Sequence, residues 1–155
     1  MIIIGIDPGQ SGGIAVIQHT LSIQSAYAVS MPETDSDVIS EIILAKCSPG
    51  PVIAYLEQVN AMPKQGVSST FKFGMSYGFL RGALAALEIR RNFVRPQVWQ
   101  KALGCLSKGD KNVTKRRAQE LFPDIKITHA LADALLIAEY GRRVESGLIV
   151  TKEEK

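Results

Sequence analysis

Four residues of this sequence have side chains and positions that could form one catalytic site. Asp7 ends an apolar run and is followed at once by a Pro-Gly turn, and Glu57 ends a second apolar run. Asp133 lies among alanines and leucines, where an unpartnered charge is costly, and His129 precedes it by one helical turn. Carboxylate oxygens without thiolates suit Mg²⁺ or Mn²⁺. The set predicts a site where two such ions hydrolyse a phosphodiester bond.

Simpler roles stay open for two of these residues. The carboxylate of Asp7 could serve only to cap the turn that follows it. The imidazole of His129, at the start of a predicted helix, could bond to backbone or solvent and hold no metal. The catalytic interpretation gains weight because two apolar strands end in the same way, each at a carboxylate.

The elements that must position these residues alternate along the chain. Strands are expected over residues 1–7, 14–17, 21–29, 52–56 and 89–94, and helices over 36–47, 70–87, 96–101, 114–121 and 128–145. Hairpins that are followed by alternating helices and strands predict an α/β fold, with a five-stranded mixed sheet flanked by helices on both faces.

Composition predicts one ordinary domain. The chain has 155 residues, 46% of them hydrophobic and 21% charged, so a single domain over 1–155 is expected, with a frayed tail over 146–155. No apolar run is long enough to span a bilayer, and no leader peptide is recognised. Cys47 and Cys105 lack metal-ligand spacing and are expected to be reduced. The sequence therefore predicts a cytoplasmic protein without a membrane partner or an organic cofactor.

The helix expected over 70–87 carries a stripe of small residues. Gly74, Gly78 and Gly82 recur every fourth position, although glycine weakens an isolated helix. The stripe predicts that another backbone approaches this helix closely, either the sheet or a second subunit.

Positive charge is concentrated in one stretch. Between Arg90 and Arg117 there are nine Lys or Arg residues and one acid, Asp110. Such a stretch binds phosphates without reading sequence. Trp99 lies in an amphipathic turn and is expected in the core, while Arg142 and Arg143 are expected on a solvated face. The candidate DNA-binding residues are Lys64, Lys101, Lys108, Lys111, Lys115 and Arg116.

At these residues the sequence resembles the RuvC-type Holliday junction resolvases of the ribonuclease H-like superfamily, and phage-encoded members in particular. The resemblance implies a homodimer that cuts four-way DNA junctions symmetrically with Mg²⁺, in the cytoplasm of a bacterium or of a phage-infected host. It implies that Asp7, Glu57 and Asp133 bind metal, and that Lys108 and Lys111 lie near the scissile strand. The matching stretches follow one another in the family's order: 4–9, 56–59, 95–100, 108–123 and 132–138.

Two positions depart from the family's pattern. The family places an acid or a histidine three residues before its last aspartate, where this chain has Ala130. His129 is one residue away, and is the candidate for the fourth ligand or for the group that assists the attacking water. Some members carry a base-stacking aromatic residue where this chain has Asn60. The stacking role is then absent or passes to the loop over 61–70.

Other functions stay open at this point. A junction-binding protein that has lost a ligand, and with it catalysis, is conceivable because of Ala130. The turn after Asp7 also resembles the first phosphate loop of actin-like and sugar kinases, but those proteins need a second domain to close over ATP. Forked DNA or RNA–DNA hybrids are alternative substrates for the same chemistry.

Overall fold

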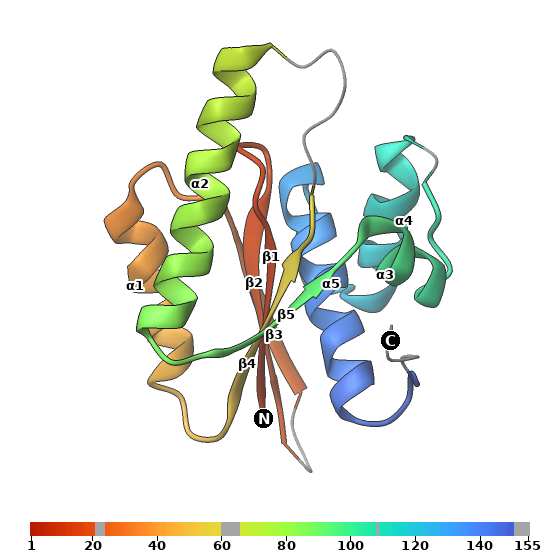
Figure 1. Ribbon diagram of the computed structural model, residues 1–155. Coiled ribbons are helices and arrows are strands. Elements are labelled where there is room, and N and C mark those ends of the chain that lie inside the picture. The colour runs from red at the N-terminus through yellow and green to blue at the C-terminus, as the bar shows by residue number, and fades with distance from the viewer. Residues whose placement is uncertain (21–23, 60–65, 108, 151–155) are drawn as a thin grey trace.

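The sheet has the predicted mixed topology. The computed structural model describes residues 1–20, 24–59, 66–107 and 109–150, and five strands form one sheet in the order β3-β2-β1-β4-β5 (Figure 1). β1 pairs antiparallel with β2 and parallel with β4, β2 pairs antiparallel with β3, and β4 pairs parallel with β5. The strands are β1 (Ile2–Asp7), β2 (Gly13–His19), β3 (Gln24–Ser30), β4 (Val52–Glu57) and β5 (Arg90–Val94).

Helices cover both faces of this sheet, which confirms the predicted fold class. α1 (Asp35–Lys46) and α2 (Val67–Ala86) lie on one face (Figure 1). α3 (Pro96–Ala102), α4 (Lys111–Leu121) and α5 (His129–Glu145) lie on the other. Within the described ranges, none of these helices is long and apolar enough to cross a membrane.

β1 is apolar on both sides because it contributes to two cores. Its Ile2, Ile4 and Ile6 pack in the core beneath α1 and α2, whereas Ile3 packs in the core beneath α5. A strand buried on both faces reads as a continuous apolar run in the sequence. The central place of β1 puts Asp7, its last residue, in the middle of one end of the sheet.

Some helix boundaries differ from the sequence prediction, and caps explain two of them. α4 begins at Lys111, three residues earlier than expected, because the carboxylate of Asp110 accepts a hydrogen bond from the backbone N–H of Asn112. The last two residues of the expected basic loop over 108–112, Lys111 and Asn112, therefore belong to the helix. α5 begins directly after Thr128, whose hydroxyl oxygen accepts from the N–H of Leu131.

The glycine stripe of α2 does not receive the sheet. A Cβ atom added at Gly74, Gly78 or Gly82 would meet nothing within 4 Å among the described residues. The expectation that the sheet approaches here is wrong, because α2 packs through Leu80 and Leu84 instead. Close approach by a second subunit stays a prediction.

Close backbone approach occurs instead between α5 and the sheet. A Cβ atom at Gly5 would overlap the backbone of Ala134 and Ala138, and one at Gly141 would overlap the ring of Tyr55. Because these two positions have no side chain, α5 lies directly against β1 and β4. A side chain at either position would hold the helix farther from the sheet. The depth of α5 matters for the site because Asp133 is next to Ala134 in the chain.

Replacing Gly5 by alanine is expected to destabilise the protein, because the added methyl group must push α5 away from β1. Overpacking of this kind costs about 1–3 kcal/mol. Gly82→Ala is the matched control, since Gly82 has open space around it and alanine is favoured over glycine in a helix by about 1 kcal/mol. Urea unfolding should show a lower midpoint for Gly5→Ala and an unchanged or higher one for Gly82→Ala. Equal midpoints would contradict the close approach of α5.

Candidate metal centre

Two of the predicted ligands lie at the ends of neighbouring parallel strands. Ile6 of β1 pairs with Leu56 of β4, and each strand ends one residue later, at Asp7 and Glu57. Side chains alternate along a strand. Ile6 and Leu56 point into the core under α1 and α2, so the carboxylates of Asp7 and Glu57 point to the opposite face, which α5 covers.

α5 brings the third carboxylate to the same place. A Cβ atom at Gly13, the residue that pairs with Asp7, would lie 2.9 Å from the carbonyl oxygen of Ala130 in the first turn of α5. Asp133 follows one turn later, and its charge repels those of Asp7 and Glu57. The structure thus brings Asp7, Glu57 and Asp133 close enough to one another for their charges to interact.

Glu57 is the most perturbed of the three carboxylates. Its pKa is raised from an ordinary value of 4.5 to about 7, first by burial and then by repulsion from Asp7. A hydrogen bond from Trp99 lowers the pKa, and repulsion from Asp133 raises it further. Only 9% of the residue's surface is exposed. A buried carboxyl group that titrates near neutral pH in the company of two others is typical of a functional site.

Asp7 both caps its turn and belongs to the cluster. The backbone N–H of Gly9 donates to its Oδ1 over 3.2 Å, which is the capping role that the sequence left open. Burial nevertheless raises the pKa of Asp7, and the Gly9 hydrogen bond opposes that rise. Repulsion from Asp133 raises the pKa further, whereas the charge of Lys111 lowers it.

Asp133 carries an oxygen that is buried without a partner. Burial raises the pKa of Asp133, and a hydrogen bond to Thr114 and the charges of Lys111 and His129 lower it. Its Oδ1 finds no hydrogen-bond partner in the described part of the chain. A buried acceptor without a donor is costly, and a bound cation is one way to satisfy it.

The donor set fits a hard divalent cation. The charge of Asp133 raises the pKa of Asp7, and the charges of Asp7 and Asp133 raise the pKa of Glu57; a cation between these carboxylates would reverse that effect. As the side chains stand, the described His, Cys, Asp and Glu residues include no group of three or more that could hold a metal ion. The carboxylates are thus electrostatically coupled, but their oxygens do not surround a single point at metal–ligand distances.

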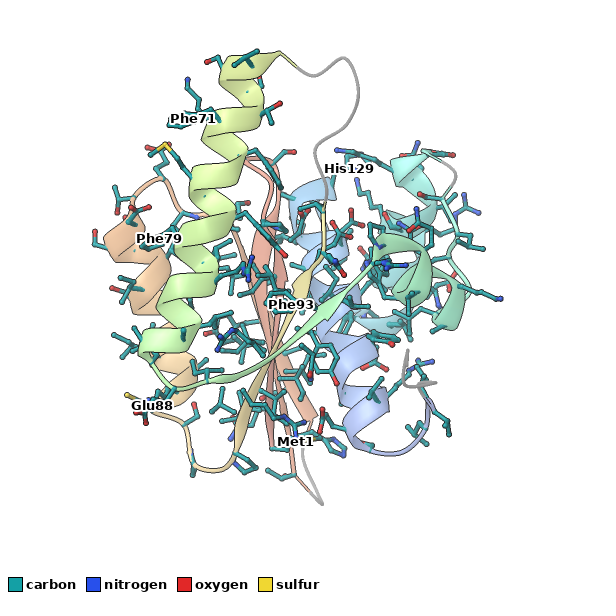
Figure 2. The ribbon with its side chains drawn as sticks, viewed as in Figure 1. Met1, Phe71, Phe79, Glu88, Phe93 and His129 are labelled. Atoms are coloured by element: carbon teal, nitrogen blue, oxygen red, sulfur yellow. The ribbon has the colours of Figure 1, made fainter. Side chains whose placement is uncertain are left out.

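His129 occupies the first turn of α5, at the same end of the molecule as the carboxylates (Figure 2). Its side chain is exposed. Its charge lowers the pKa of Asp133, so the two residues are electrostatically coupled. Ala130, at the position of the family's fourth ligand, presents its backbone carbonyl to Gly13.

The sequence prediction missed one contact of the site. Trp99 is fully buried in the core, as predicted, but its indole Nε1 donates a hydrogen bond to Oε1 of Glu57 over 2.9 Å. A signal for this contact was available, because a buried indole N–H needs an acceptor. The sequence therefore placed Trp99 in the core without identifying the acceptor of its indole N–H.

The basic candidates divide by position. Lys111, Lys115 and Arg116 lie on α4, and Lys111 is close enough to act on both Asp7 and Asp133. Lys101 lies in the last turn of α3 and is exposed. Lys64 and Lys108 lie outside the described residues, so the structure does not place them. Among the described candidates, Lys111 at the start of α4 is the one whose charge lowers the pKa of Asp7 and Asp133.

The expectation for two arginines of α5 is wrong. Arg142 and Arg143 both bind Glu139, at distances of 2.7–2.8 Å, and Glu139 is only 3% exposed. The pKa of Glu139 is lowered by these two partners in spite of its burial. Spacings of three and four residues place both arginines on one side of the helix with the carboxylate. They form an ion-pair cluster around a buried carboxylate, with both arginines partly buried, and not a solvated face.

Glu57→Gln is expected to change how stability depends on pH. Between about pH 4.5 and 7 the unfolded state loses the Glu57 proton and the folded state keeps it, so wild-type stability falls as pH rises across that window. Glutamine keeps the acceptor for Trp99 and carries no charge. Thermal unfolding without metal should show the variant more stable than wild type at about pH 8, by about 1–3 kcal/mol, and little different at about pH 4. An equal loss of stability at both values would contradict the pKa assigned to Glu57.

Comparison with known proteins supplies the fold. No protein-family model matches the chain, and no curated protein matches it. Two solved structures of RuvC from Thermus thermophilus are similar, each over 95% of this chain and 97% of its own, with a TM-score of 0.60. The first is 19% identical to this chain. The second, at 20% identity, is RuvC in complex with a Holliday junction substrate. This chain therefore has the ribonuclease H-like fold of RuvC.

Proposed function

We propose that this chain is a metal-dependent, structure-selective DNA endonuclease that resolves Holliday junctions or related branched DNA. The observation that carries the proposal is the meeting of Asp7, Glu57 and Asp133, from β1, β4 and α5, at one end of a RuvC-like sheet. The similarity to RuvC in complex with a Holliday junction substrate supports a junction as the substrate class.

The three carboxylates would hold Mg²⁺, or Mn²⁺ in its place. Two such ions, if held there, would supply an activated water and charge stabilisation for the leaving oxygen in phosphodiester hydrolysis. Asp7 and Glu57 contribute oxygens from rigid strand ends, and Asp133 contributes the unpartnered Oδ1 from α5. His129 is the proposed group that accepts a proton from the attacking water or completes the ligand set. Its exposed place in the first turn of α5 leaves it accessible to DNA.

The basic side chains would bind the DNA backbone next to this site. Lys111 opens α4, and Lys115 and Arg116 follow on the same helix. Lys101, Lys108 and Lys64 complete the proposed phosphate contacts. Lys111 has a second role, because its charge offsets the mutual repulsion of Asp7 and Asp133 while no cation is bound.

A homodimer would place two such sites on one junction, as symmetric cleavage requires. The exposed face of α2 is the proposed dimer surface. Val67, Phe71 and Met75 are 87%, 67% and 61% exposed there, and Phe71 points away from the sheet (Figure 2). The open stripe at Gly74 and Gly78 would let a second copy of α2 approach closely.

One observation favours a second function. Ala130 stands at the position of the family's fourth ligand, and its side chain cannot bind a cation. A site with three carboxylates and no effective fourth group would bind a junction without cutting it. Junction binding by this chain without cleavage, in Mg²⁺ and in Mn²⁺, would decide for this function.

Asp7→Asn is expected to abolish cleavage while leaving junction binding in place, because it removes a carboxylate and keeps the hydrogen bond from Gly9. Removal of a metal-holding carboxylate should lower the cleavage rate by at least about 10³-fold. The assay uses a labelled four-way junction beside linear duplex, forked DNA and an RNA–DNA hybrid, with Mg²⁺, with Mn²⁺ and with chelator. Asp124→Asn is the control, since Asp124 is an exposed acid between α4 and α5. Full activity of Asp7→Asn at saturating Mg²⁺ would falsify the proposed mechanism.

Arg116→Gln is expected to weaken junction binding through a lost phosphate contact. The slope of log Kd against log salt concentration should fall by about 1, because one fewer counterion is released. Lys46→Gln is the control, since Lys46 is in the last turn of α1 and contacts the backbone oxygen of Leu87. The control should keep the wild-type slope. A reduced slope in the control, or an unchanged slope in Arg116→Gln, would count against α4 as the DNA contact.

A further inference from the structure

The indole of Trp99 makes a hydrogen bond to one of the three carboxylates, in addition to its packing in the core. Nε1 donates to Oε1 of Glu57 over 2.9 Å, and both groups are buried. Trp99 is held in turn by the core: it packs in the cluster formed by Leu103, Cys105 and the apolar side of α5. Arg95 caps the two-turn helix that carries it, and Pro96 opens that helix. The donor is therefore fixed in position before any ligand arrives.

The hydrogen bond between Trp99 and Glu57 can have only one donor. An indole N–H can only donate, so it binds the carboxylate oxygen and never competes for a cation. It occupies Oε1 and leaves Oε2 of Glu57 without that partner. Glu57 is repelled by both Asp7 and Asp133, and nothing else among the described contacts of its side chain holds it beside them. Without the indole, a repelled carboxylate would turn to a rotamer farther from the other two.

We propose that Trp99 is a positioning residue, whose indole N–H holds the Glu57 carboxylate in the orientation that binds the divalent cation. The proposal rests on the nuclease function proposed above and adds to it a residue that touches neither DNA nor metal. Groups that orient a metal ligand typically change metal affinity by about 10–100-fold when they are removed.

The chain offers a direct probe of this contact, because Trp99 is its only tryptophan. A ¹H–¹⁵N spectrum of the uniformly labelled protein will contain one indole N–H signal, and that signal reports on the hydrogen bond to Glu57. Addition of Mg²⁺ alone, without DNA, should shift this signal in a saturable way. The same titration of Glu57→Gln, which keeps the acceptor and loses the charge, should shift it little. An indole signal that does not move at Mg²⁺ concentrations that support cleavage would overturn the proposal.

Trp99→Phe removes the N–H and keeps most of the ring. The variant should bind Mn²⁺ at least about 10-fold more weakly in calorimetry, and should need about 10-fold more Mg²⁺ for half-maximal cleavage. Its maximal rate at saturating Mg²⁺ should stay within about threefold of wild type, because the ligands themselves remain. The change is therefore in metal requirement and not in overall activity, which a general loss of packing would not produce.

A core variant separates positioning from stability. Ile42→Val removes apolar volume from the core on the other face of the sheet, and Ile42 is fully buried. It should lower the unfolding midpoint and leave the Mg²⁺ requirement unchanged. An equal rise in Mg²⁺ requirement in Ile42→Val and Trp99→Phe would overturn the positioning role.

The failure of this inference can be distinguished from failure of the nuclease function. If wild type cleaves junctions with Mg²⁺ and Trp99→Phe has the same Mn²⁺ affinity and Mg²⁺ requirement, the positioning role is wrong and the nuclease stands. If wild type binds no divalent cation and cuts no junction, the nuclease is wrong, and the Trp99 proposal is overturned with it.

Discussion

The structure depends on how closely α5 lies on the sheet. Gly5 and Gly141 allow the helix backbone and its alanines to touch β1 and β4 directly. This contact fixes the distance between α5 and the sheet. Asp133 therefore lies beside the ends of β1 and β4, which carry Asp7 and Glu57. If α5 packed less closely on the sheet, the same three carboxylates would be present in the chain but would lie farther apart.

The carboxylates are held together against their mutual repulsion. Burial raises the pKa of all three carboxyl groups, and neighbouring carboxylates raise those of Asp7 and Glu57 further. Donors from outside the trio offset part of the cost. Lys111 acts on Asp7 and Asp133, while Trp99 acts on Glu57. The site resembles many functional sites, in which local stability is given up for a poised arrangement.

Much of this could be predicted from the sequence, and the exceptions share a cause. Apolar runs and their breaks located the strands, and two runs that end in an acid indicated where the site lies. The partner of Trp99 and the open stripe at Gly74 could not be predicted in this way, whereas the pairing of Arg142 with Glu139 follows from their spacing of three residues on one helix. Periodicity shows which residues are buried, but these contacts depend on which buried groups from distant segments meet.

The contact of α5 with Tyr55 has a consequence for how this fold can change over time. Gly141 lies against the ring of Tyr55, and Glu145 accepts a hydrogen bond from the Tyr55 hydroxyl, so these two residues anchor α5 to β4 two to three turns away from Asp133. Part of the anchoring therefore lies at the end of α5 that is far from the proposed metal site. Side chains of the exposed first turn, such as His129, can be exchanged without changing the contact with Tyr55. A scaffold built in this way could exchange the proposed cutting for binding while the packing at the other end of the helix is inherited intact.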